Sequence, residues 1–198
     1  MSKTSLESIQ KLRKMTGLGM LDCKKALDQN DGNIEKAVEA LRKKGAALAN
    51  KRADKDTAEG IVVPYIHPGN QAGVLIELNC ETDFVARTEG VMQFAKDVAM
   101  HIAAMKPLYL KPEEVEQSFL DKEREIAKEQ LLNEGKPAAM IDKILEGKMK
   151  RIYSEICLLQ QKFIKDDKMS ISDKLEELIA QTGEKIQIKR FSHFEIGA

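Results

Sequence analysis

The stretch that decides the fold is "GVLIELNCETDFVART", residues 73–88. Its opening run, residues 73–76, is short and apolar and predicts a buried strand. Further on, apolar residues recur at helical spacing: Val91, Phe94, Ala95, Val98 and Ile102. The chain must therefore turn from a strand to a helix near Asp83 and Phe84. Turns usually face water, so Phe84 is either a lid on the protein's own core or a contact for a partner.

Composition limits the class of protein. The chain has 198 residues, 42% of them hydrophobic and 32% charged, which allows one medium domain or a small domain beside a larger one. The formal net charge is zero, so no overall positive field favours nucleic acid as a partner. No apolar run approaches the roughly 20 residues that span a bilayer. We therefore expect a soluble, cytoplasmic protein that binds neither nucleic acid nor a membrane.

Motifs for catalysis, cofactors and metals are absent from the sequence. Cys23, Cys80 and Cys157 lie far apart, which predicts buried thiols in a reducing cytosol rather than disulfides or a zinc site. No phosphate loop GxxxxGK[ST], GxGxxG, HExxH or GxSxG occurs. The three histidines fall on separate expected elements. We expect no enzyme activity, no cofactor and no metal site.

The first 45 residues predict a compact three-helix unit that ends at Gly45. Its apolar stripes are Leu6, Ile9, Leu12 and Met15, then Cys23, Ala26 and Leu27, then Ile34, Val38 and Leu41. A unit of this size has little interior in which to build a site, so it is typical of a docking module. Residues 50–57, "NKRADKDT", are charged and without apolar periodicity, which predicts a linker. We expect a first domain over residues 1–55.

The second domain, residues 56–198, predicts a small antiparallel sheet with helices. Residues 61–66 and 73–78 are expected strands joined by the turn 67–70, and a long helix begins near residue 88 and ends before Pro107. A short helix after residue 170 ends at Gly183. The last strand lies within residues 186–196 and is expected beside the two earlier strands. Its apolar residues share one side: Ile186, Ile188, Phe194 and Ile196.

A helical hairpin is expected over about residues 113–163. Its first arm has a weak apolar stripe, Val115, Phe119 and Ile126, and residues 135–137 break the helix. The second arm carries apolar residues at alternating spacings of four and three, which predicts an antiparallel coiled-coil pair. These residues are Leu145, Met149, Ile152, Ile156, Leu159 and Phe163. The fold class is therefore α+β: a helical docking unit, a small antiparallel sheet packed with helices, and a helical hairpin.

Two long motifs resemble the bacterial elongation factor Ts family in its short form. They are "LRKMTGLGMLDCKKAL", residues 12–27, and "ELNCETDFVAR", residues 77–87. Weaker similarity extends over "HIAA" from His101, residues 135–137 and residues 190–195. The resemblance implies a three-helix, UBA-like first domain. It also implies a guanine-nucleotide exchange factor for elongation factor Tu, which it would bind in the GDP-bound and nucleotide-free states.

The resemblance also implies which residues act. Asp83 and Phe84, flanked by Thr82 and Val85, would enter the partner near its nucleotide and magnesium. A second set would dock the partner: Arg13, Met20, Leu21, His101, Phe163 and Ile164. Lys162 stands where the family has proline. From the residues alone, Met20 and Leu21 could instead be core of the three-helix unit, and His101 could be a buried histidine satisfied by the protein's own groups.

Chain length adds one expectation, and other functions stay open. Longer family members carry two copies of the α/β unit, and this chain has room for one, so we expect a homodimer. One rival is a non-exchanging helical adaptor for another translation or ubiquitin-like partner. An RNA-associated factor is a weaker rival because of the zero net charge.

Overall fold

The computed structural model describes residues 4–197 and shows the α+β fold predicted from the sequence. The chain divides into two compact units. Among the described residues, the first contains 4–63, 76–97 and 173–189; the second contains 64–75, 98–172 and 190–197. The sequence predicted a domain boundary at residue 55, meaning that residues 1–55 and 56–198 fold separately. The division into compact units does not test that boundary, which stays a prediction.

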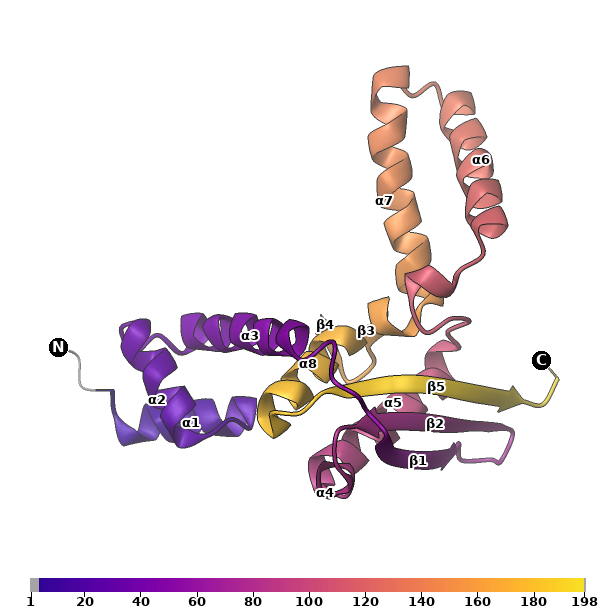
Figure 1. Ribbon diagram of the computed structural model, residues 1–198. Coiled ribbons are helices and arrows are strands. Elements are labelled where there is room, and N and C mark those ends of the chain that lie inside the picture. Colours follow the sequence, from indigo (N-terminus) through magenta and orange to yellow (C-terminus); the bar gives the residue numbers. More distant parts are fainter. Residues whose placement is uncertain (1–3, 198) are drawn as a thin grey trace. The chain divides into compact units, whose positions relative to one another are not determined.

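Three helices open the first unit: α1 (Leu6–Thr16), α2 (Met20–Gln29) and α3 (Ile34–Lys51) (Figure 1). Ser5 caps α1 by accepting from the Ser8 N–H, and Asn33 caps α3 in the same way. The buried residues of the three helices form one core: Ile9, Leu12, Cys23, Ala26, Leu27, Ala37 and Leu41. Leu6 and Met15 were predicted to join the first stripe but are exposed, because they lie near the two ends of α1.

The prediction that α3 ends at Gly45 is wrong, because the helix continues to Lys51. A Cβ atom at this position would lie 3.2 Å from the Cβ of Ala180 in α8 (Ile171–Thr182). The glycine therefore lets another helix approach α3 closely. That packing outweighs the low helix propensity of glycine, which is about 1 kcal/mol less favourable than alanine.

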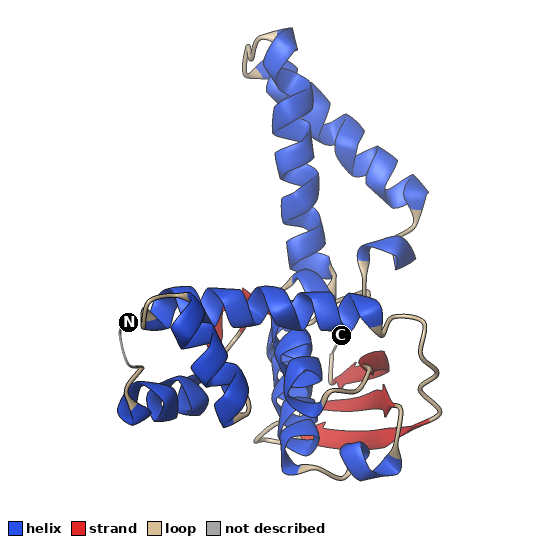
Figure 2. Cartoon of the chain, turned by 60° about the vertical axis from the view of Figure 1, so that its left-hand side comes forward, coloured by secondary structure: helices blue, strands red, loops and turns tan. Residues whose placement is uncertain are grey.

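The three-stranded sheet consists of β1 (Glu59–Ile66), β2 (Ala72–Cys80) and β5 (Ile186–Glu195), in the order β1-β2-β5 (Figure 2). The last strand thus joins the sheet of the two earlier strands, as predicted, and pairs with β2. In the turn after β1, the His67 N–H donates to the Ala72 carbonyl oxygen at 2.9 Å, and Gly69 adopts a φ of +97°. In β2, alternate side chains from Val74 to Cys80 are buried, as expected for a strand with one face on a core.

The apolar residues of β5 have two different environments. Ile186 and Ile188 are buried, as expected, whereas Phe194 is 67% exposed and Ile196, one residue beyond the strand, is 76% exposed. Alternation along a strand fixes only the side on which a residue lies. Burial along β5 changes phase after Ile188: residues 189 and 190 are both exposed, and beyond them the odd-numbered residues are the partly buried ones, so Phe194 lies on the exposed side.

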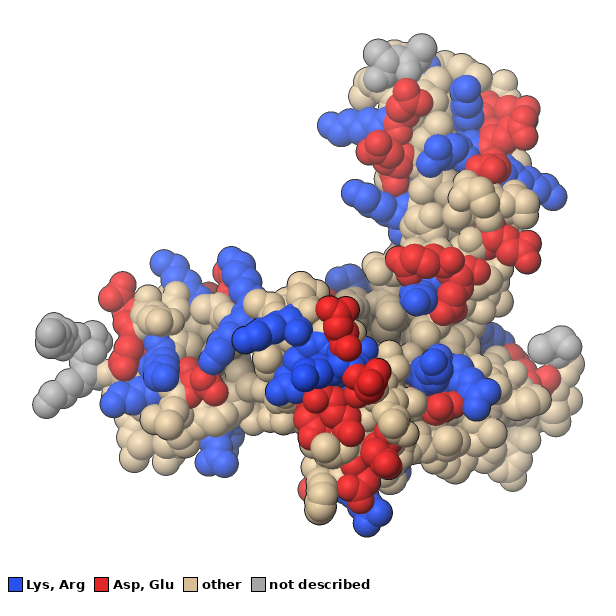
Figure 3. Space-filling view, in the orientation of Figure 1, with Lys and Arg blue, Asp and Glu red and all other residues tan. Residues whose placement is uncertain are grey.

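The predicted helical hairpin is formed by α6 (Gln117–Asn133) and α7 (Ala138–Ile156). Its interior includes Leu120, Ala127 and Leu131 from α6 and Ile141, Leu145 and Met149 from α7. Ile126, predicted for the first-arm stripe, is 41% exposed. Figure 3 shows acidic and basic side chains interspersed on the visible face of this pair, as on a solvated surface.

The coiled-coil pattern predicted that the second helix of the hairpin extends to Phe163, but α7 ends at Ile156. Cys157 is extended, and the Leu158 N–H donates to the Tyr109 carbonyl oxygen at 2.9 Å. Leu159 therefore lies in a 3₁₀ turn (Leu158–Gln160), and Phe163 lies in β3 (Lys162–Phe163), which pairs antiparallel with β4 (Asp166–Ser170). Hydrogen bonds to another segment redirect the chain, although the spacing of apolar residues continues.

Two further helices follow β2: α4 (Asp83–Ala86) and α5 (Glu89–Met105).

The three cysteines are buried and free, as predicted. Among residues 4–197, no helix is long and apolar enough to cross a membrane.

Candidate functional site

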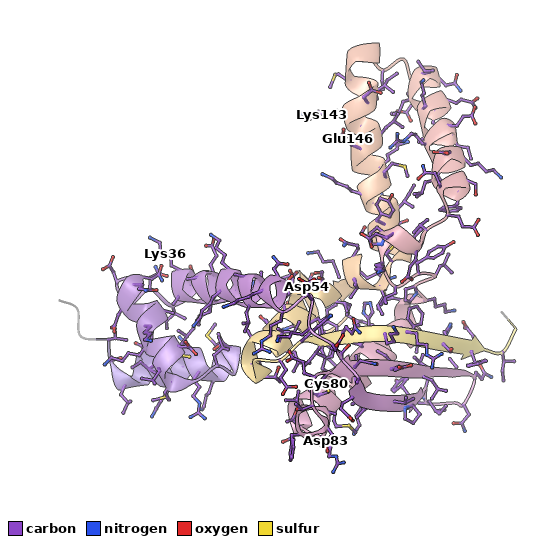
Figure 4. All side chains as sticks on the ribbon, viewed as in Figure 1. Lys36, Asp54, Cys80, Asp83, Lys143 and Glu146 are labelled. Carbon is purple, nitrogen blue, oxygen red and sulfur yellow. The ribbon has the colours of Figure 1, made fainter. Side chains whose placement is uncertain are left out.

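The 82–85 turn projects an aromatic side chain into solvent. It consists of Thr82 and most of the single-turn helix α4, and Phe84 within it is 81% exposed. The lid interpretation of Phe84 is therefore wrong. Asp83 is half-buried and pairs with Arg87 at 3.1 Å, so the ring is presented beside a carboxylate. Figure 4 labels Asp83 on α4 and Cys80 at the end of β2, the two residues that flank the base of the turn.

Thr82 caps α4 and is itself held by Glu184. The Thr82 hydroxyl donates to Glu184 Oε1 at 2.8 Å, and the Thr82 N–H donates to Glu184 Oε2 at 3.1 Å. The same hydroxyl oxygen accepts from the Val85 N–H at 3.4 Å. Both carboxylate oxygens of Glu184 are thus used at the residue where the helical turn begins.

A second carboxylate, that of Glu81, joins the same two segments from the other side: it precedes Thr82 and binds the residue that follows Glu184. Its Oε1 accepts from the Lys185 N–H at 2.6 Å, and both its oxygens accept from Arg52 Nη1, at 2.8 and 2.9 Å. These partners, the Lys185 N–H first, hold the pKa of Glu81 below its ordinary value. Next to it, burial and the Glu184 carboxylate raise the pKa of the Cys80 thiol, which donates to the Thr82 carbonyl oxygen at 3.1 Å.

The segment expected as a linker is bound along its length. Lys185 Nζ donates to the carbonyl oxygens of Ala53 and Lys55, at 2.6 and 2.8 Å. Thr57 accepts from Asn79 at its carbonyl oxygen and from Gln187 at its hydroxyl. Sequence reasoning missed these partners because they come from residues far along the chain, and a run of charges carries no signal of where it will bind.

The predicted docking residues of the three-helix unit lie on its surface. Arg13 on α1 is exposed, and Met20 and Leu21 begin α2 with exposed fractions of 37% and 74%. The core interpretation is therefore wrong for Leu21, and Met20 lies at the margin of the surface. An exposed leucine and methionine at the start of a helix offer apolar contact to another protein.

In the second unit, His101 is fully buried and satisfied within the chain. Its Nδ1 accepts from the Ile164 N–H at 3.2 Å, so the ring carries its proton on Nε2, which donates to Gln161 Oε1 at 2.9 Å. Burial lowers the pKa of His101, against the effect of Gln161. The interpretation of His101 as a satisfied core histidine describes this chain correctly.

Among the predicted docking residues of the second unit, only Ile164 is substantially exposed, at 48%. Phe163 is buried beside the His101 ring, with the two ring centres 6.2 Å apart. Direct contact of His101 or Phe163 with a partner stays a prediction. Among residues 4–197, no group of three or more His, Cys, Asp or Glu side chains could hold a metal ion.

Comparison with known proteins identifies the family. The family profile described as Elongation factor TS matches residues 12–198. The elongation factor Ts of Solidesulfovibrio magneticus is 52% identical over 197 residues, covering 100% of this chain and 98% of that protein. The corresponding proteins of Carboxydothermus hydrogenoformans and Thermotoga neapolitana are 50% and 49% identical, covering 96% and 98% of this chain and 88% and 98% of their own lengths.

This similarity extends over the whole sequence, and it includes both motifs from which the resemblance was first drawn. The chain belongs to the elongation factor Ts family, whose members are non-catalytic nucleotide exchange factors for elongation factor Tu in translation elongation and work in the cytoplasm.

Proposed function

We propose that this chain releases GDP from elongation factor Tu by inserting Phe84, with Asp83 beside it, close to the partner's nucleotide and magnesium. The observation that carries the proposal is the 81% exposure of Phe84 on a turn whose base is fixed by hydrogen bonds. An exposed phenylalanine gains free energy when a partner removes it from water. Thr82 and Val85 shape the turn that presents the ring.

Exchange then follows from reciprocal coupling between two ligands of one partner. A factor that binds nucleotide-free elongation factor Tu more tightly than the GDP-bound form weakens GDP binding by the same ratio. The chain needs no cofactor and forms no covalent bond in this process. Its contribution is the binding energy that is used to displace the partner's nucleotide-holding segments.

Docking is assigned to a separate surface. Arg13, Met20 and Leu21 would bind the partner through the first domain, residues 1–55, while the core, residues 56–198, carries out the displacement. Ile164 supplies a further apolar contact, and His101 and Phe163 support it from behind. A protein held at one surface presents its second surface at a raised effective concentration.

The test is release of labelled GDP from elongation factor Tu with the parent chain and with Phe84→Ala. Loss of a buried aromatic anchor costs on the order of 2 kcal/mol, so we expect about a thirtyfold loss of exchange efficiency. The thermal melting temperature should not change, since the ring covers none of the protein's own core.

Leu132→Ala is the matched control, because Leu132 is 53% exposed on α6, outside the proposed site. Unchanged exchange by Phe84→Ala would overturn the proposal. A parent chain that binds elongation factor Tu and leaves GDP release unchanged would instead favour the non-exchanging adaptor.

We further propose that the chain forms a homodimer through the second unit. Exposed apolar residues of that unit line one groove between the β1–β2 turn and the end of β5: Ile66, Leu75, Phe194 and Ile196. Exposed apolar groups that lie close together are typical of an interface. Since the three cysteines are buried and free, the dimer should persist in reductant.

Sedimentation equilibrium of the full chain tests the dimer. The parent should be dimeric at micromolar concentration, and Phe194→Asp should be monomeric because it would place a charge in an apolar interface. A folded, monomeric parent would overturn the proposal.

A further inference from the structure

We propose that Glu184 is a positioning residue for nucleotide exchange: by holding Thr82 it fixes the direction in which Phe84 leaves the protein surface. The inference rests on the proposed function, in which the Phe84 ring enters the partner. It concerns the residue that prepares the ring for this step.

The first step is that α4 cannot hold its own shape. It has four residues, and its closing main-chain hydrogen bonds, Ala86 N–H to Thr82 O and Arg87 N–H to Asp83 O, are both 3.2 Å long. An isolated turn of helix is unstable, because few hydrogen bonds offset the ordering of the backbone. Phe84 cannot anchor the turn by packing, since it is exposed, and only Ala86 is buried. The orientation of the ring must therefore be set from outside the helix.

Glu184 supplies that constraint at the residue where α4 begins. A hydroxyl has one proton, and the Thr82 hydroxyl gives it to Glu184 Oε1. This donation leaves the lone pairs of the same oxygen free to accept from the Val85 N–H. The second carboxylate oxygen holds the Thr82 N–H. Because hydrogen bonds to a carboxylate are stronger than neutral ones, the cap is held in one rotamer and one backbone orientation.

Glu184 is itself placed by the end of α8. Gly183 has a φ of +75°, and its N–H donates to the Ile179 carbonyl oxygen at 2.8 Å, which ends the helix. The Glu184 N–H then donates to the Thr182 hydroxyl at 3.4 Å. Since glycine favours this left-handed conformation at a helix end, the position of the glutamate is fixed by local structure.

The neighbouring residues complete a reciprocal arrangement. Glu184 accepts from the main chain of Thr82, and Glu81 accepts from the main chain of Lys185. Arg52, the C-cap residue of α3, binds Glu81 through both carboxylate oxygens. The base of the 82–85 turn thus cannot shift without breaking several charge-assisted hydrogen bonds. A binding group that is held in its bound orientation loses less entropy on association.

The first test compares the parent with Glu184→Gln, which keeps the size of the side chain. The glutamine amide has one oxygen that can accept, whereas its NH₂ group can only donate. One of the two hydrogen bonds from Thr82 is therefore lost, because a donor of Thr82 then faces the donor NH₂ group. We expect the maximal rate of GDP release at saturating factor to fall on the order of tenfold, because small misplacements of a positioned group have large kinetic effects. The concentration needed for half-maximal release should change less, since Met20 and Leu21 are intact.

Thr82 variants provide an independent route to the same constraint. Thr82→Val removes the hydroxyl and should reduce the maximal rate, whereas Thr82→Ser keeps the hydroxyl and should restore it. Glu39→Gln is the matched control, because it removes a carboxylate paired with Lys43 on the surface of α3. That variant should exchange like the parent.

A double-mutant cycle separates positioning from general stability. In a Phe84→Ala background, Glu184→Gln should have little further effect on exchange, because there is no ring left to aim. If Glu184→Gln lowers exchange equally in both backgrounds, or only in proportion to a lowered melting temperature, the positioning role is overturned. If Phe84→Ala alone leaves exchange unchanged, the proposed function fails. If Phe84→Ala reduces exchange and Glu184→Gln does not, only the positioning inference fails.

Discussion

Phe84 and Ile164 are both exposed apolar side chains held from behind by polar groups, yet the two supports have opposite chemistry. The support of Phe84 consists of two carboxylates, Glu81 and Glu184, near the surface; the Glu81 side chain is 19% exposed. The support of Ile164 is a neutral pair, His101 and Gln161, with exposed fractions of 0% and 1%. The first lies in one compact unit and the second in the other.

The difference shows how burial selects the hydrogen-bonding group. A carboxylate can act as a strong acceptor where water and a cation such as Arg52 reduce the cost of its charge. In the interior, a neutral imidazole accepts through Nδ1 and donates through Nε2 without a charge to desolvate. We therefore expect changes at the buried pair to affect stability first and changes at the carboxylates to affect presentation of the ring first.

The largest expected effect is the loss of stability in His101→Ala. This change leaves a cavity and removes the partners of the Ile164 N–H and Gln161 Oε1, so the free energy of unfolding should fall by about 3 kcal/mol. Denaturant unfolding monitored by circular dichroism measures it. The control is His67→Ala, at an exposed turn, which should stay within about 0.5 kcal/mol of the parent. An equally small effect at His101 would contradict the comparison.

A smaller effect should separate the two supports by pH. Burial holds the pKa of His101 below its ordinary value of 6.5, so the neutral form stabilises the fold and this contribution is lost as the pH falls through the folded-state pKa. At one pH unit below 6.5 the loss is at most about 1.4 kcal/mol. The pKa of Glu81 is also lowered, from 4.5, so its contribution is complete above 4.5 and is lost only in stronger acid.

Unfolding free energies measured between pH 7.5 and pH 3 test this separation. The parent should lose stability in both ranges, whereas His101→Ala, which has no imidazole to protonate, should lose stability only in the lower range. Glu81→Gln should instead flatten the lower range. If Glu81→Gln changed the upper range, the assignment of the two groups would be wrong.

The smallest expected effect is on partner affinity in Ile164→Ala. The side chain is half-exposed, so truncation should weaken binding to elongation factor Tu by about 1 kcal/mol, or roughly fivefold, without lowering the melting temperature. Titration calorimetry measures the affinity. If Ile164→Ala binds elongation factor Tu with normal affinity, Ile164 is not a partner contact and only Phe84 would be one. The His101 and Gln161 pair would then matter for stability and not for binding.

Much of the fold and part of the candidate site could be predicted from local patterns. Helical spacing located α1, α2, α5, α6 and α7, short apolar runs on either side of a turn located β1 and β2, and alternation located β5. These signals are local, because side-chain periodicity follows from backbone geometry. The family motifs, which need no structure, identified the 82–85 turn. The exposure of Phe84 and the burial of His101 could not be read from spacing, since the same apolar or aromatic residue fits a core or a surface.

The sequence by itself determined the α+β class, the main helices and strands, and the family with its partner, because each depends on residues that are close together in the chain. Only the tertiary structure decided what holds the 82–85 turn, since Thr82 and Glu184 are 102 positions apart. It also decided that Gly45 continues a helix against Ala180 and that Phe194 stays exposed. Hydrogen bonds and burial depend on which distant segments meet, and no local pattern specifies that meeting.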